Sequence, residues 1–293
     1  MATSEEFVPN APPSLSNNPN SFSPIVDLAL AFFTWVGNLL LLIFIPLAFL
    51  IPYAIHRGLT FGSPNFAQTF AELAVKDPTA IFLQVLATLP THLLTFVIVW
   101  AVVTRFGRRP FWASLGWGWS KHLGWPQSIA LGVLLFFASM GVAYVLGGNK
   151  PTQLDLILNS SPASKYLIAF LATFTAPFAE EFVYRGLLYS ALERIGGKVI
   201  AVIFVLALFT LVHVPQYWPN LGVIAAVGLL SVVLTIVRAV SGKLLPCVVI
   251  HFVFNGIQSA LIVLGVSSPK PEVTPERITT LIQPLFHFFH FLN

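Results

Sequence analysis

The chain has 293 residues, of which 56% are hydrophobic and only 9% charged, and its formal net charge is +4. Soluble globular domains carry about 25% charged residues, so this composition excludes an ordinary soluble domain and indicates that the lipid bilayer is the solvent. The positive charges form no block of like charge, which argues against a nucleic-acid-binding surface. The single cysteine, Cys247, excludes an internal disulfide bond.

Residues 1–24 precede the first apolar run and are rich in Pro, Asn and Ser. They carry Glu5 and Glu6 and lack the basic start of a secretory signal. This composition predicts a disordered N-terminal tail. The apolar run that follows is too long for a signal peptide, so we expect it to stay in the membrane.

Seven apolar segments follow, and each can cross the hydrocarbon core of a bilayer as a helix. They cover residues 25–55, 80–103, 128–146, 166–192, 199–214, 221–240 and 244–266. The first contains Pro46 and Pro52, so we expect it to be tilted, kinked or extended past the interface. The connection 104–127 combines basic residues with tryptophans, which is typical of a cytoplasmic interfacial segment.

The last part of the chain is polar after residue 266 and then ends in an aromatic run, 284–292. This run is too short to span a bilayer and aromatic enough to lie in the interface. We therefore predict an all-α fold, a polytopic transmembrane helix bundle of about seven spans with an interfacial C-terminal segment.

Ionisable residues inside apolar spans cost about 2.5–3.5 kcal/mol each on insertion scales and are functional candidates by default. In this chain the candidates, with one amide, are Glu180, Glu181, Arg185, His213, His251 and Asn255. Glu181 and Arg185 are four residues apart and should pair on one helix face, whereas Glu180 lies about 100° around the axis. His251 and Asn255 are also four residues apart and should project together.

Two other charged residues lie at the ends of spans. Asp27 is at the start of the first span and Arg238 at the end of the sixth. We expect Arg238 to extend its long side chain to the membrane interface, as such residues commonly do.

A turn at Gly196 and Gly197 would bring the candidates together. Glu180 lies 16 residues before Gly196 and His213 lies 16 residues after Gly197. Antiparallel helices would place both at one depth, about 24 Å from the turn at the helical rise. A second turn at 241–243 would place the histidine and asparagine of the last span about 12 and 18 Å from this second turn, measured along the helix. We therefore expect all four side chains in one intramembrane layer.

The chemistry of this layer follows from its residue types. A carboxylate and an imidazole that share a water molecule form a general base. Neutral imidazole and amide donors opposite them can bind the oxyanion of a tetrahedral intermediate. The pattern indicates a hydrolase without a serine or cysteine nucleophile.

Three motifs carry a resemblance to a known family. Residues 180–185 (EEFVYR), 209–213 (FTLVH) and 251–255 (HFVFN) resemble the motifs EExxxR, FxxxH and HxxxN of the CPBP family. These are the CAAX-protease and bacteriocin-processing membrane proteins, also called the Abi family. The resemblance covers about residues 166–266, with the motifs in the family's order.

The resemblance implies an intramembrane glutamic endopeptidase that cleaves a membrane-associated peptide or protein. Its catalytic residues would be Glu180, His213, His251 and Asn255, with Glu181 and Arg185 in support. The first two would activate water, the next two would stabilise the oxyanion, and the glutamate–arginine pair would hold the site in shape.

No cofactor is expected, but a zinc ion held by Glu180, His213 and His251 stays an open alternative. A non-proteolytic membrane scaffold or bacteriocin-immunity-type regulator is a second alternative, and the complete catalytic set argues against it. A transporter that relays protons through buried charges is a third, but the chain lacks repeated halves with paired broken helices.

The histidines outside the motifs receive no catalytic role: His56 and His92, and the interfacial His287 and His290.

The chain thus divides into four predicted regions: a disordered tail at 1–24, an N-terminal transmembrane region at 25–165, a CPBP-like catalytic core at 166–266 and an interfacial tail at 267–293. The expected partners are a peptide or membrane-protein substrate and the lipid bilayer, with no nucleic acid. In a bacterial host the location would be the inner membrane, and a leader peptide or membrane-bound propeptide would be the substrate class.

Overall fold

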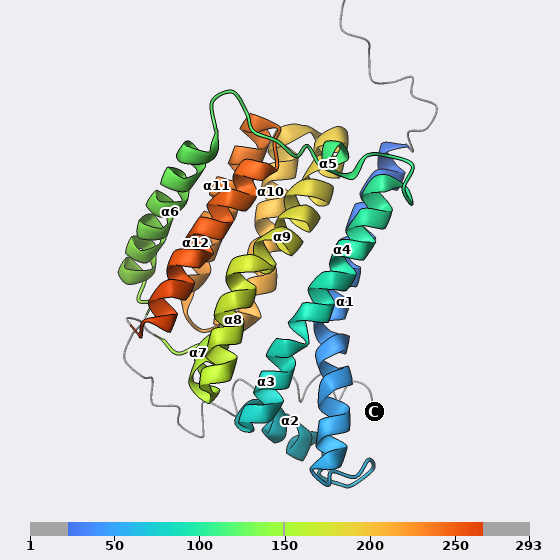
Figure 1. Ribbon diagram of the computed structural model, residues 1–293, viewed down its shortest axis with the longest axis vertical. Coiled ribbons are helices and arrows are strands. Elements are labelled where there is room, and N and C mark those ends of the chain that lie inside the picture. The colour runs from blue at the N-terminus through green and yellow to red at the C-terminus, as the bar shows by residue number, and fades with distance from the viewer. Residues whose placement is uncertain (1–22, 149, 266–293) are drawn as a thin grey trace, which may run out of the picture.

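The computed structural model describes residues 23–148 and 150–265, and this part of the chain is helical without strands (Figure 1). The first helices are α1 (Pro24–His56), α2 (Phe66–Lys76), α3 (Pro78–Leu86), α4 (Thr88–Thr104), α5 (Phe111–Ser114) and α6 (Trp125–Val145). They are followed by α7 (Gln153–Ser160), α8 (Pro162–Phe174), α9 (Ala176–Glu181), the π-helix η2 (Phe182–Leu188), α10 (Tyr189–Tyr217), α11 (Leu221–Ser241) and α12 (Leu245–Val263). The predicted all-α bundle is confirmed, whereas the terminal tails, with His287 and His290, lie outside the described residues.

Six helical segments in the described part are long and apolar enough to cross a membrane, so the protein is an integral membrane protein. The fourth, Pro162–Tyr217, has 56 residues and includes the predicted turn at Gly197, whose φ of 77° and ψ of 177° are not helical. The rings of Tyr184 and Phe209, on either side of this turn, are 5.0 Å apart. The segment therefore folds back on itself, and its two arms account for the seven predicted crossings.

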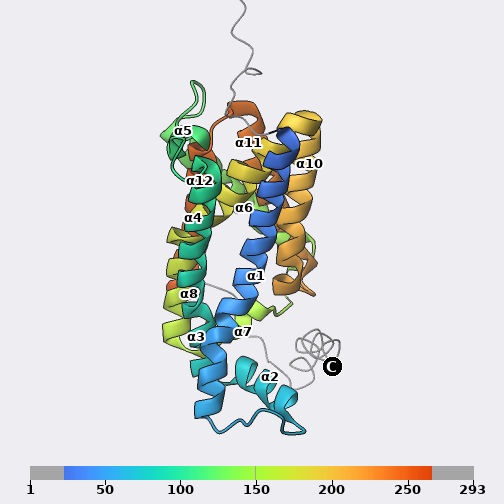
Figure 2. The ribbon, with the colours of Figure 1, turned by 90° about the vertical axis from the view of Figure 1, so that its right-hand side faces the viewer.

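The helices form a bundle with α6 at one edge and the pair α1 and α4 at the other (Figure 1). Between these edges lie α8, α9, α10, α11 and α12. The short α2 lies at the same end of the molecule as α3, and α5 lies at the opposite end (Figure 2). The central helices carry all three sequence motifs.

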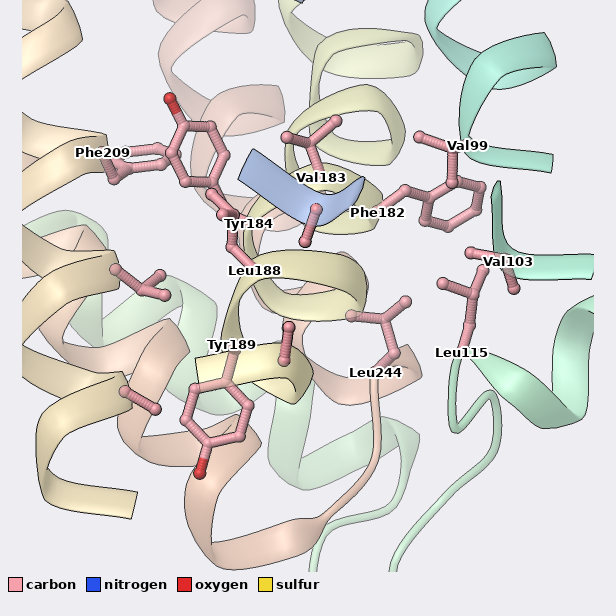
Figure 3. Close-up of a cluster of buried hydrophobic side chains, with 14 of the residues drawn as sticks. Val99, Val103, Leu115, Phe182, Val183, Tyr184, Leu188, Tyr189, Phe209 and Leu244 are labelled. Carbon is pink, nitrogen blue, oxygen red and sulfur yellow. The ribbon is translucent and has the colours of Figure 1, made fainter. Parts of the chain in front are cut away.

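A cluster of buried apolar residues joins the motif-free N-terminal region to the motif-bearing helices (Figure 3). Phe182 of η2 lies beside Val99 and Val103 of α4 (Figure 3). Its ring also makes edge contacts with the aromatic residues Phe96, Phe111, Trp112, Trp117 and Phe178. The helix that follows the two glutamates is thus packed on one side by the motif-free N-terminal region.

The expectation for Arg238 is wrong, because its side chain stays inside the protein instead of reaching the interface. The residue is 7% exposed. Its guanidinium donates to the Gly242 carbonyl oxygen at 3.0 Å and to the Ser190 hydroxyl at 3.1 Å. These two partners hold the guanidinium inside the protein at the end of α11.

Candidate active site

A cavity of about 370 Å³ lies inside the bundle. It is lined by residues of α1, α4, α7, α8, α9, η2, α10, α11 and α12. Its polar lining includes Asn38, Thr88, His92, Glu180, Tyr184, His213, Gln216, Tyr217, His251, Asn255, Gln258 and Ser259. The four residues that the sequence predicts to be catalytic therefore line a single cavity.

Glu181 and Arg185 form the predicted ion pair. Both side chains are fully buried, and Nη1 of Arg185 lies 3.0 Å from Oε1 of Glu181. The rest of the guanidinium donates to Ser231 and Thr235 of α11 at 3.0–3.2 Å and packs over a phenyl ring, that of Phe209. Each nitrogen of the guanidinium group therefore has a hydrogen-bond partner, as a buried charge requires.

The segment around this pair is a π-helix rather than an α-helix. The π turn η2 begins directly after Glu181 and contains Arg185. Single π turns are rare and occur frequently at functional sites, because the extra residue shifts the side chains that follow. Here the turn lets Arg185 reach α11 while Glu180 stays on the cavity wall.

His251 lies between the two adjacent glutamates. Its Nδ1 is 2.9 Å from Oε1 of Glu181, and its Nε2 is 3.8 Å from Oε2 of Glu180. A carboxylate only accepts hydrogen bonds, so Nδ1 carries the hydrogen and donates it to Glu181. Sequence reasoning assigned Glu181 to Arg185 alone and missed this second contact.

His213 is held in one tautomer by the backbone of its own helix. Its Nδ1 lies 2.7 Å from the carbonyl oxygen of Phe209. Because a carbonyl only accepts, Nδ1 carries the hydrogen and Nε2 keeps a lone pair. Nε2 has no partner within the described part of the chain, so the lone pair is available in the cavity.

Asn255 lies one helical turn after His251 on α12 and also lines the cavity. Its Nδ2 donates to the carbonyl oxygen of Ala172 in α8 at 2.8 Å. The amide group has a second hydrogen on the same nitrogen. The bond to α8 therefore fixes the direction of the amide without using both donors.

Sequence reasoning missed His92 of α4. This residue lines the same cavity, is 7% exposed, and has its Nδ1 2.8 Å from the hydroxyl oxygen of Thr175. The signal was present in the sequence, because Thr88, Thr91, His92 and Thr95 form a polar stripe on one face of an otherwise apolar span. A search for periodic polar residues inside apolar segments would have found it.

Among the residues that the structure describes, no three His, Cys, Asp or Glu side chains are grouped closely enough to hold a metal ion. The zinc set that the sequence leaves open, Glu180, His213 and His251, is therefore not assembled as a ligand group in this structure.

Residues 162–257 match the sequence model of a family described as type II CAAX prenyl endopeptidase Rce1-like. This segment is 96 of the 293 residues, and it contains all three motifs. The segment is therefore similar to the CAAX-protease family, as the motifs predict. Searches of the curated proteins and of the solved structures found no match. His92 and the α1 residues of the cavity lie outside the matched segment.

Proposed function

We propose that the protein is an intramembrane glutamic endopeptidase, in which Glu180 and His213 activate water while His251 and Asn255 stabilise the oxyanion. The matched family supports a CAAX-type membrane peptidase. The observation that carries the residue assignment is the position of these four side chains on one cavity inside apolar helices. Glu181 and Arg185 support them structurally.

Glu180 is the carboxylate that water and substrate can reach. Its side chain is 26% exposed, whereas the Glu181 side chain is fully buried. In the proposed reaction Glu180 takes a proton from water, assisted by the Nε2 lone pair of His213, and the water oxygen attacks the peptide carbonyl carbon. The proton then passes to the leaving nitrogen as the C–N bond breaks, which gives a carboxylate and an amine.

His251 supplies the oxyanion with a donor only when its ring is protonated. Its Nδ1 hydrogen is used by Glu181, so a neutral ring presents a lone pair at Nε2. The proposed oxyanion role therefore requires a second hydrogen, on Nε2, which faces Glu180 at 3.8 Å. The second amide hydrogen of Asn255 is the other proposed donor.

The substrate class follows from the position of the cavity. Its walls are membrane-spanning helices, so the scissile bond belongs to a peptide or protein that enters from the bilayer. For a protein of the bacterial inner membrane, we propose a leader peptide or a membrane-bound propeptide. The description of the matched family also makes a prenylated CAAX peptide a substrate to test.

The deciding experiment is a proteolysis assay with the purified protein in detergent and in liposomes. The substrates are a fluorogenic peptide library and an S-farnesylated CAAX peptide. Wild type should cleave at least one of them, and Glu180→Gln should lose at least 100-fold in rate at an unchanged melting temperature, as expected when the general base is removed. A Glu180→Gln protein with wild-type rates would refute the mechanism.

Metal removal provides the second arm of the assay. Without a metal in the mechanism, EDTA and phenanthroline should leave the cleavage rate unchanged. Strong inhibition by both chelators that added zinc reverses would favour a metalloprotease instead. If wild type cleaved no peptide at all, the scaffold or regulator alternative would replace the proposal.

A further inference from the structure

His92 contributes to the cavity from a part of the chain that neither the motifs nor the family match cover. It is on α4, which packs against α9, the helix of Glu180. The last helix, α12, packs against α9 as well. In Figure 1, α4 and α12 lie on opposite sides of α9. Glu180 therefore projects from a helix that is flanked by the helix of His92 on one side and the helix of His251 on the other.

The hydrogen bonds around His92 determine its tautomer. The Thr175 hydroxyl donates its only hydrogen to the carbonyl oxygen of Leu171 at 3.1 Å. With that hydrogen used, we assign the remaining contact as one in which the hydroxyl oxygen accepts from Nδ1 of His92, 2.8 Å away. Nδ1 carries the hydrogen, and Nε2 keeps a lone pair that no residue of the described ranges engages.

His92 lines the cavity, so its Nε2 can accept a hydrogen bond from a donor that enters there. Glu180 in its charged form only accepts hydrogen bonds and cannot be that donor. A peptide substrate carries a main-chain N–H at each residue. Each N–H that enters the apolar interior of the membrane needs an acceptor there.

We propose that His92 is a substrate-binding residue, and that its Nε2 accepts a hydrogen bond from a main-chain N–H of the peptide beside Glu180. The proposal rests on the proposed peptidase function. It extends the site into the N-terminal region and assigns α4 a role in holding the peptide backbone.

Two matched substitutions separate this role from a structural one. His92→Asn keeps an N–H donor near the position of Nδ1, and so keeps the bond to Thr175, but has no acceptor at the position of Nε2. His92→Gln can place an acceptor near Nε2 but loses the bond to Thr175. The bond should exist in both the ground state and the transition state, so its loss should raise KM and leave kcat unchanged. We expect a KM increase of about 5- to 150-fold for His92→Asn, with an unchanged melting temperature.

The probe is the peptide that wild type cleaves in the assay above, prepared with one N-methyl group at each peptide bond in turn. Methylation at the bond whose N–H meets His92 should raise KM for wild type and make no further difference for His92→Asn, because both changes remove the same interaction. His92→Gln should be less stable than His92→Asn but should have the lower KM of the two variants. These results would support the proposal.

A His92→Asn protein with wild-type KM and kcat, while Glu180→Gln is inactive, would overturn the substrate-binding role and leave the peptidase function intact. The role would also be overturned if every N-methyl group changed KM by the same factor in His92→Asn as in wild type, because the two changes would then act independently. Active Glu180→Gln would instead overturn the proposed function. An independent measurement is histidine nitrogen NMR, in which the Nδ1-protonated form of His92 should persist in Thr175→Ser and be lost in Thr175→Val.

Discussion

Glu180 and Glu181 are neighbours in the sequence but have different surroundings. Oε1 of Glu181 is shared between Arg185 and His251 in a fully buried position. Glu180 faces the cavity and lies 3.8 Å from Nε2 of His251. The same substitution at the two positions should therefore have different consequences.

Glu180→Gln should give a stable protein without activity, because the cavity tolerates a neutral amide. Glu181→Gln should be destabilised by about 3–5 kcal/mol, because it leaves the buried Arg185 without its counter-charge. Melting temperature and cleavage rate per folded protein should be measured for both variants in detergent. Equal melting temperatures with equal losses of activity would contradict this division of roles.

Asn255→Ala should lower kcat by roughly 10²–10³, as expected for the loss of one oxyanion donor. It also removes the hydrogen bond to Ala172, so a moderate loss of stability, about 1 kcal/mol, should accompany it. Initial rates over a range of substrate concentrations separate the two effects. A raised KM with unchanged kcat would identify Asn255 as a substrate-binding residue instead.

The sequence predicts part of this residue-scale picture. The ion pair of Glu181 with Arg185 follows from helical spacing and is present. The contact of His251 with Glu181 could not be predicted, because it depends on how α12 is rotated about its axis against α9. The role proposed for His92 likewise depends on which helix packs beside Glu180, and a single sequence does not contain that information.

Among the elements, the two arms on either side of Gly197 were predicted from a glycine pair between apolar runs. The breaks within spans were not predicted. The span Pro78–Thr104 is divided at Ala87, and α8 ends at Thr175 before the π turn η2. The apolar composition continues across these interruptions, but Pro90 and Pro177 lie shortly after the breaks at Ala87 and Thr175, so a proline signal for these two breaks was present in the sequence.

Gly197→Ala should destabilise the protein by about 1–3 kcal/mol, because φ 77° with ψ 177° is accessible almost only to glycine. No atom lies within 4 Å of the added methyl group, so the strain comes from the backbone alone. Gly141→Ala is the matched control, since Gly141 is in helix α6 with open space around it and no positive φ. Melting temperatures should fall for the first variant only. A similar fall for both would show that the turn is not the cause.

Asp77 caps the N-terminus of α3 and should make stability depend on pH. Burial would raise the pKa of Asp77, but hydrogen bonds from Ala80, Tyr53 and Thr79, with the charge of Arg57, outweigh it and hold the pKa below its usual value of 3.8. A lowered pKa means that the charged form stabilises the fold above pH 3.8, and that this stabilisation is lost as pH falls. The melting temperature of wild type should exceed that of Asp77→Asn at neutral pH. The difference should shrink in acid, and a constant difference down to pH 3 would contradict the assignment.

At the scale of the whole molecule, the site is assembled from two parts of the chain with different sequence character. The motif-bearing segment supplies the proposed catalytic groups, and α1 and α4 supply a wall of the cavity. Trp35 of α1 donates to the Tyr184 hydroxyl at 3.0 Å, directly beside the buried arginine. The apolar cluster around Phe182 joins the same two parts. Composition predicts that both parts lie in the membrane but not how they face each other, because lipid and protein are equally apolar neighbours for such helices.

Asp27 joins the two parts near one end of the bundle. Its carboxylate forms ion pairs with Arg105, after α4, and with Arg194 of α10. The Asp27 and Arg105 side chains are only 12% and 14% exposed, so their attraction is less screened than that of a surface pair. Asp27→Asn should therefore lower the free energy of unfolding by about 1.5–3 kcal/mol, as expected for a hydrogen bond between charged groups.

The activity per folded molecule of Asp27→Asn should stay at the wild-type level, because Asp27 does not line the cavity of Glu180. Glu72→Gln provides the control, since the Glu72–Lys76 pair has side chains that are 44% and 52% exposed and should contribute at most about 0.5 kcal/mol. Thermal unfolding in detergent and cleavage rates measure both properties. A loss of activity in Asp27→Asn at an unchanged melting temperature would show that this end of the bundle acts on the site directly and does not only hold the two parts together.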